Sequence, residues 1–150
     1  MLATIGASSD QMARAYRRAR PLAKKHEPLA WMANLSEAEL GGFRRRGMQL
    51  VADLLAHLDA DPGDAALLAA AELHASEYGR EAAGLGASLS DTVEGFLRFR
   101  KPFVDELAVL ASRRRLDTRQ ATVLLVDAES ALDRLLIALM VGHGARWRQA

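Results

Sequence analysis

The sequence contains no cysteine and few aromatic residues, which make up 5% of its 150 residues. Without cysteine the chain can form neither a disulfide nor a thiolate metal site, so its stability has to come from packing. Alanine and leucine dominate and β-branched residues are few, a mixture that favours helices over strands. A chain of this length is large enough to bury a core as one domain. We therefore expect a single all-helical domain over residues 1–150.

The sequence also lacks any long hydrophobic run. Its apolar stretches are far shorter than the ~18 residues that cross a bilayer, and its first twenty residues lack the apolar core of a secretory signal. The formal net charge is only +1, so no global field attracts nucleic acid or an anionic membrane. These features predict a cytoplasmic protein that neither enters nor binds a membrane.

Two helices are predicted in the first half of the chain. A capping box of Ser36 and Glu39 starts the first, whose apolar residues then recur at helical spacing as far as Leu58. The turn at 59–63 ends it, and a second helix is expected from about residue 64 to 83.

Two further helices are predicted in the second half. After the glycine turn at 84–86, Ser88 with Asp91 caps a helix in which Pro102 predicts a kink. The pair Asp117 and Gln120 caps the last helix, which we expect to end near Val141 because two glycines follow. Residues 36–141 would then form the core of the domain. Residues 1–35 would add an N-terminal helical region, giving five to six helices in all.

The last helix carries an apolar seam with alternating spacings of three and four residues. This heptad pattern fits either a core helix or one that packs against a second copy of the chain. We expect it to form the interface of a homodimer, through Leu125, Ala128, Leu132, Leu135 and Leu139.

No group of residues in the sequence matches a known catalytic or metal-binding pattern. His74 and Glu77 share one face of a helix, but a di-iron bundle needs the opposite order twice and a zinc enzyme needs three ligands. Haem needs a proximal histidine that faces a large apolar pocket, and nothing marks His57 or His74 for that role. We therefore expect a protein that is not an enzyme and holds no metal or cofactor.

Basic and aromatic residues gather around Pro102. Arg100 lies four residues after Phe96 and three before Phe103, so it borders the apolar face of its helix and needs a partner. Glu94, Asp105 or a bound anion could supply one. We expect an ion pair here, and as the alternative a ligand pocket formed by Tyr78, Phe96, Phe99 and Arg100.

Other basic residues cluster in three places, which leaves nucleic-acid binding as an alternative function. Three consecutive arginines spread around a helix rather than forming one stripe, and no helix-turn-helix spacing accompanies them. We expect these clusters to be solvated charges at helix faces and ends: residues 14–25, 44–46 and 113–115.

Residues 77–107, EYGREAAGLGASLSDTVEGFLRFRKPFVDEL, resemble the N-terminal domain of the RsbR/RsbRD stressosome co-antagonists. The likeness lies in the glycine turn at Gly84 and Gly86, the cap at residues 88–91, and Phe96 with Arg100 in the helix that follows. It extends over residues 36–141. This resemblance implies a globin-like or orthogonal helical bundle without haem that acts as a dimeric sensory input module, and it supplies no catalytic residues.

The expected function is therefore non-enzymatic: a signal-sensing or regulatory interaction domain of a bacterial stress-response or transcriptional regulator. It would act as a homodimer, possess a regulatory protein partner and transmit a shift in packing between its last two helices. A small-molecule or haem-binding helical protein is the first alternative, and a nucleic-acid-binding fragment of a regulator is the second.

Overall fold

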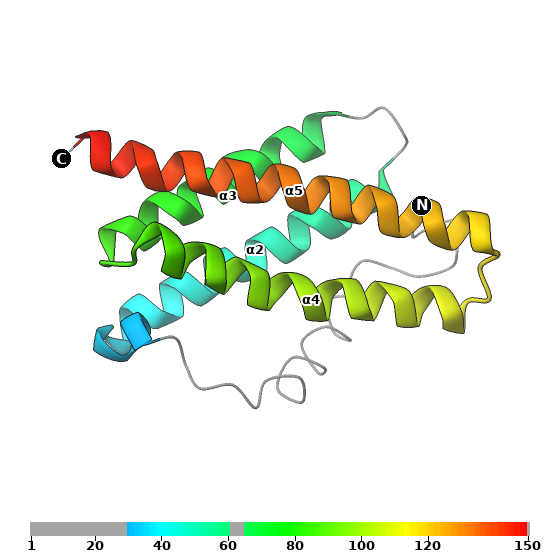
Figure 1. The fold of residues 1–150 in the computed structure, drawn as a ribbon, viewed down its shortest axis with the longest axis horizontal. Helices are drawn as coiled ribbons and strands as arrows, with labels where there is room; N and C mark the ends of the chain where they lie inside the picture. Colours follow the sequence, from blue (N-terminus) through cyan, green and yellow to red (C-terminus); the bar gives the residue numbers. More distant parts are fainter. Residues whose placement is uncertain (1–29, 61–64, 150) are drawn as a thin grey trace.

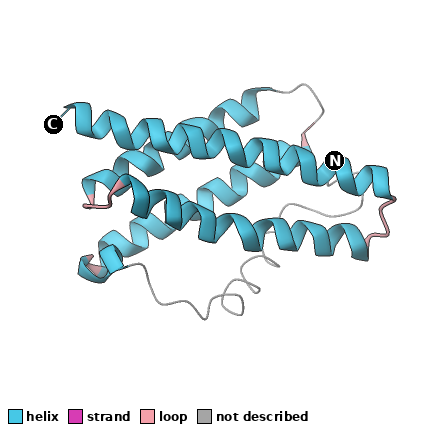
Figure 2. Cartoon of the chain, in the orientation of Figure 1, coloured by secondary structure: helices cyan, strands magenta, loops and turns pink. Residues whose placement is uncertain are grey.

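The computed structural model describes residues 30–60 and 65–149 of the chain. A short 3-10 helix, η2 (Ala30–Asn34), leads into α2 (Glu37–Asp59) and α3 (Ala65–Gly84). They are followed by α4 (Leu89–Arg113) and the long α5 (Thr118–Gln149). The described residues hold helices and turns and no strand (Figure 2). The all-helical class is thus confirmed, with four α-helices in the described ranges rather than five to six.

The helices begin where the sequence predicts. Ser36 and Glu39 form a reciprocal capping box at α2, and Ser88 and Asp91 form another at α4. At the start of α5, Gln120 N–H donates to Asp117 at 2.8 Å, and the Asp117 N–H donates back to Gln120 at 3.2 Å. Each pair satisfies backbone donors that the first turn of a helix leaves without a partner.

Two helices end in the same kind of turn. After α3, Ala87 N–H donates to the Ala82 carbonyl and Gly86 has a φ of +96°. After α4, Leu116 N–H donates to Ala111, and Arg115 takes the left-handed position with a φ of 52°. These are Schellman ends, in which the left-handed residue usually is glycine because it lacks Cβ.

The four helices form two antiparallel pairs that lie one behind the other (Figure 1). α2 and α3 make the rear pair, and α4 and α5 make the front pair. α5 contacts each of the other three helices, and α3 crosses it most intimately. The main core lies between the pairs and is filled chiefly by leucine, with Phe96 and Phe103 from α4.

A smaller apolar cluster lies where α2, α3 and η2 meet. Trp31 packs edge-on against Phe43, and the Phe43 ring lies 4.4 Å from that of Tyr78. Next to this cluster, the buried His143 of α5 bonds the Ala87 carbonyl through Nε2 at 2.8 Å. This bond ties α5 to the turn between α3 and α4.

α3 and α5 approach so closely that side chains are excluded at the crossing. A Cβ atom at Gly79 would collide with the Leu139 carbonyl, and one at Gly142 would collide with the Ser76 carbonyl and come within 2.8 Å of Ser76 Cα. The surrounding positions of α3 are small as well, with Ala71, Ala75 and Ala82 buried. The predicted end of the last helix near Val141 is therefore wrong. Gly142 permits close packing within α5, which continues to Gln149.

Candidate functional site

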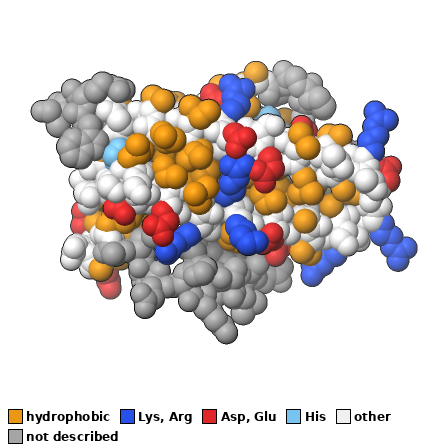
Figure 3. Space-filling model, in the orientation of Figure 1, with side chains coloured by type: hydrophobic (Ala, Val, Ile, Leu, Met, Phe, Trp, Pro, Cys, Tyr) orange, Lys and Arg blue, Asp and Glu red, His pale blue; other side chains and the backbone are white. Residues whose placement is uncertain are grey.

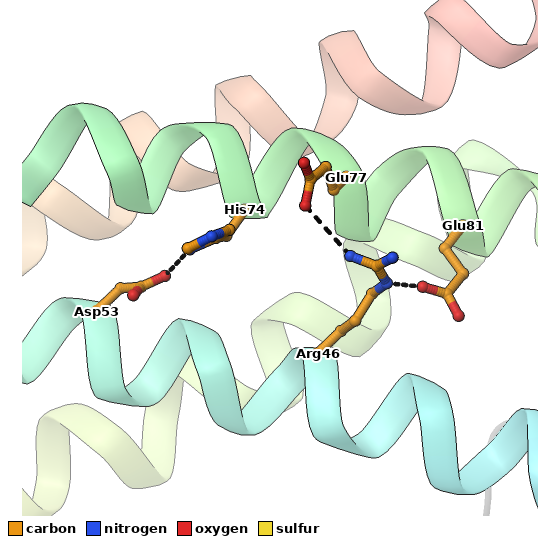
Figure 4. Close-up of polar contacts among 5 residues, drawn as sticks. All are labelled: Arg46, Asp53, His74, Glu77 and Glu81. Carbon is orange, nitrogen blue, oxygen red and sulfur yellow. Dashed lines mark hydrogen bonds and ion pairs between the residues drawn. The ribbon is translucent and has the colours of Figure 1, made fainter.

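A polar hollow of the described surface lies between α2 and α3. It encloses about 450 Å³, and its walls combine cationic, acidic and amide side chains with one histidine. Figure 4 shows how most of the polar side chains at this site point across the gap between the two helices. The lining residues are Gly42, Arg45, Arg46, Gln49, His74, Glu77 and Glu81. We name this hollow the α2–α3 groove.

One end of the α2–α3 groove holds a histidine that a carboxylate orients. His74 Nδ1 lies 2.6 Å from Asp53 Oδ2, and Gln49 Nε2 donates to the other oxygen of the same carboxylate at 2.9 Å. The Asp53 side chain is only 12% exposed. An ionised carboxylate at this distance places the proton of a neutral imidazole on Nδ1, which leaves Nε2 as an acceptor. His74 could therefore accept a hydrogen bond from a molecule in the groove.

The other end of the α2–α3 groove is occupied by an arginine between two glutamates. Arg46 pairs with Glu77 at 3.3 Å and with Glu81, which lies one turn further along α3. All three side chains remain in contact with solvent. Pairs this exposed contribute little to stability, on the order of 1 kcal/mol or less. They fix the orientation of Arg46 and leave it accessible to a competing anion.

His74 and Glu77 do not act together in this arrangement. His74 contacts Asp53, whereas Glu77 contacts Arg46. Within residues 30–60 and 65–149, no group of three histidine or acidic side chains could hold a metal ion. The chemistry that the groove offers is hydrogen bonding and charge pairing by side chains that water also reaches.

The four residues predicted to line a ligand pocket fall into three different places. Tyr78 packs on Phe43 beside α2, as described above. Phe96 is buried in the main core, and the Phe99 ring lies between those of Phe96 and Phe103, tilted against both, with ring centroids 5.6 and 5.8 Å away. Arg100 lies at the junction of α4 and α5. None of these four residues lines the α2–α3 groove.

Arg100 is held by two carboxylates of α5. It donates to Asp133 at 2.8 Å and pairs with Glu129 one turn earlier. Burial acts to lower the pKa of Arg100, but the hydrogen bonds and charges of Glu129 and Asp133 outweigh it and raise that pKa above its ordinary value. The expected ion pair is therefore present. Its partners differ from the expected Glu94 and Asp105, which bind Arg98 and Lys101 within α4.

The predicted interface seam faces the interior of the chain. Ala128, Leu132, Leu135 and Leu139 are 0% exposed, and Leu125 is packed against the same core. A heptad pattern shows that a helix has a partner along one stripe, but not whether that partner belongs to the same chain. An interface on α5 has to use other residues.

The opposite side of α5 is apolar and exposed. Val126, Ile137 and Val141 are 56%, 62% and 57% exposed, although large apolar side chains are usually covered. These side chains follow one stripe of the helix that also contains two charged residues at its centre. We name this stripe the outer face of α5: Val123, Val126, Ser130, Asp133, Arg134, Ile137 and Val141.

A second hollow adjoins the outer face of α5. It encloses about 340 Å³ between α3 and α5, beside the ion pair of Arg134 with Glu72 at 2.6 Å. Ile137, Ala138 and Val141 give it an apolar wall. Figure 3 shows the side of the molecule formed by α4 and α5, where hydrophobic side chains lie on both sides of a band of charged ones.

Sequence reasoning missed both the α2–α3 groove and the outer face of α5. The facing sets of polar residues on α2 and α3 become a site only when the two helices are aligned antiparallel. The sequence does contain a signal for the outer face of α5. The exposed valines and Ile137 form a second apolar stripe on this helix, opposite the stripe that faces the core. The basic residues at 14–25 lie outside the described residues.

None of the helices in the described ranges is both long enough and apolar enough to cross a membrane. Comparisons of the chain with known protein families, curated proteins and solved structures find no match. The resemblance to the stressosome co-antagonists therefore stays a prediction.

Proposed function

We propose that this chain is a non-enzymatic regulatory interaction domain that acts as a homodimer through the outer face of α5. The observation that carries this proposal is the row of exposed apolar side chains along the longest helix of the fold. A second copy offers the same row, and a surface that pairs with itself is the usual basis of a two-fold dimer.

The energetics favour covering this face. Burial of apolar surface is worth roughly 25 cal/mol per Å², so covering these exposed side chains would be favourable. Val126, Ile137 and Val141 extend over four turns of one rigid element, so they would be buried together without any rearrangement of the core.

The regulatory part of the proposal is supported by where α5 lies. Its outer face is exposed, while its inner face contacts α2, α3 and α4. A partner bound at α5 would thus be one helix away from each of α2, α3 and α4. The resemblance to bacterial stress-response regulators supports the same function, with a signal passed between α4 and α5.

The test is the mass of the full chain in solution, measured by light scattering over a range of concentrations. We expect twice the 16.3 kDa of one chain. Ile137→Asp should shift the mass toward that of one chain, because it places a carboxylate in the interface. Val109→Asp is the matched control, since Val109 is an exposed apolar residue of α4 and the dimer should persist. A native protein with the mass of one chain would refute the proposal.

A second candidate function is small-molecule binding in the α2–α3 groove. The observation in its favour is the oriented His74 beside Arg46 in a hollow of about 450 Å³. A thermal-shift screen with small anions, amino acids and nucleotides would test it, with His74→Gln as the variant that loses the response. An absorbance spectrum of the same sample would reveal a haem band if the ligand were haem.

A further inference from the structure

The two charged residues of the outer face of α5 lie on its opposite edges. Successive residues of a helix are about 100° apart, so Asp133 and Arg134 stand about 40° and 60° to either side of Ile137. Asp133 accepts from Arg100 of α4 at 2.8 Å, whereas Arg134 donates to Glu72 of α3 at 2.6 Å. The outer face therefore has an acidic residue on its α4 side and a basic residue on its α3 side.

Apolar and small residues lie between these two edges. Val126 and Ser130 stand within about 20° of Ile137 around the helix axis, and all three are exposed. We name the line through these three residues the midline of the outer face. Asp133 and Arg134 are 65% and 60% exposed despite their partners within the chain, and a carboxylate and a guanidinium each bind more than one partner. A helix packed along the midline would therefore meet both charges.

From this arrangement we infer that two copies pair with their α5 helices parallel, about a two-fold axis that runs along the midline. In such a pair every midline residue faces its own copy, and the α4 side of one helix faces the α3 side of the other. Asp133 of each copy then meets Arg134 of the partner subunit, once on each side of the axis. This inference rests on the proposed homodimer and specifies its orientation.

Charge decides between the two orientations. In an antiparallel two-fold pair, the α4 side of one helix faces the α4 side of the other. The residues of α5 that flank Asp133 on that side are Glu129 and Met140, and Arg100 beside them is already shared by the two carboxylates. Asp133 would thus meet an acidic or an apolar residue of the second α5, which is unfavourable. The parallel pair instead places it against Arg134 of the partner subunit.

The parallel pair also fixes the register. When a two-fold axis runs along the helices, residues of equal number lie at equal height. Asp133 and Arg134 of the partner subunit then differ by one residue, about 1.5 Å along the axis, which their side chains can span. The intrachain partners continue this contact as a row of alternating sign on each side of the axis: Arg100, Asp133, then Arg134 and Glu72 of the partner subunit.

Disulfide trapping tests the orientation directly, since the chain has no cysteine of its own. In the parallel pair the single variants Val126→Cys and Ile137→Cys should both form covalent dimers on mild oxidation, because each residue faces its own copy. In an antiparallel pair both cannot. The two positions are about 16 Å apart along α5, so at least one would lie about 16 Å or more from its copy, beyond the reach of a disulfide. Val109→Cys, on α4, is the matched control and should not crosslink.

Charge reversal tests the contact between the two edges. We expect Asp133→Arg and Arg134→Asp each to weaken dimerisation on the order of tenfold, measured by sedimentation equilibrium at low salt, because each places like charges across the interface. The double variant Asp133→Arg/Arg134→Asp should restore the native affinity to within about threefold. Recovery cannot come from within one chain, since the exchanged side chains face Arg100 and Glu72 with like charges. Circular dichroism would establish that each variant is folded.

The outcomes separate the inference from the proposed function. Crosslinking of both midline variants together with recovery in the double charge reversal supports the parallel pair. A native dimer in which only one midline variant or neither crosslinks, or whose affinity the single reversals leave unchanged, overturns the parallel pair and leaves the homodimer standing. A native chain that stays single in solution overturns both.

Discussion

α3 meets α5 through glycine and alanine on one side, and on the other side it faces α2 with charged side chains along the α2–α3 groove. On the α5 side, Gly79 and Gly142 let the two backbones touch. On the α2 side, His74, Glu77 and Glu81 reach across the α2–α3 groove to Asp53 and Arg46. The same helix thus has one face where nothing can be added and one face that already contains open space.

Specificity in this fold resides at the crossing of α3 and α5 rather than at the α2–α3 groove. A backbone-to-backbone crossing depends on the absence of atoms, so few substitutions at its centre can be accommodated. An exposed ion pair exchanges its partner for water at little cost. We therefore expect the sequence to be constrained on the α5 side and tolerant on the α2 side.

The largest expected effect is at the crossing. Gly142→Ala should lower the free energy of unfolding by about 3 kcal/mol, because the added methyl group has to separate α5 from the Ser76 backbone. Urea denaturation followed by circular dichroism would measure it.

Gly41→Ala is the matched control for this substitution. Gly41 is also inside a helix, but its nearest obstacle is the end of the Arg45 side chain at 3.6 Å. Alanine should therefore stabilise α2 by up to about 1 kcal/mol through its helix propensity. Equal effects of the two substitutions would mean that the crossing is not as tight as described.

A smaller loss is expected where α5 is bonded to the turn after α3. His143→Leu should cost about 2 kcal/mol, since the buried Ala87 carbonyl loses its side-chain donor. His57→Leu serves for comparison, because no described group bonds His57 Nδ1 and its removal should leave stability nearly unchanged. Thermal denaturation of both variants gives the readout, and a harmless His143→Leu would show that the bond is dispensable.

The smallest effect is expected in the α2–α3 groove. Arg46→Ala should cost less than about 1 kcal/mol at low salt and still less at high salt, because its two ion pairs are exposed. Arg44→Ala, at a neighbouring exposed arginine, controls for the loss of charge. A loss of several kcal/mol from Arg46→Ala would erase the contrast between the two faces of α3.

Local signals in the sequence were sufficient to predict the four α-helices and the residues at which they begin. The capping pairs at Ser36, Ser88 and Asp117 act between residues three apart, so their geometry follows once the helix forms. The turn at Gly86 is equally local.

The predictions that were wrong concern residues whose contacts are with residues distant in the sequence. Gly142 resembles a helix stop in the sequence, and only its position against Ser76 shows why glycine is needed within α5. Arg100 was expected to find a partner in its own helix, yet Asp133 and Glu129 come from 33 and 29 residues away. The apolar seam of α5 correctly predicted that this stripe packs against other helices. Periodicity alone does not show whether those helices belong to the same chain or to a second copy.

The glycine crossing also has a mechanical consequence. Sliding α5 along α3 by one turn would bring a residue with a Cβ atom, such as Ala138, to the place where Gly142 meets the Ser76 carbonyl. The two helices therefore cannot slide past each other, and we expect them to move as one rigid body. Motion transmitted from a partner on α5 would then be taken up at the contacts of this helix pair with α2 and α4, which are made in part by side-chain ion pairs.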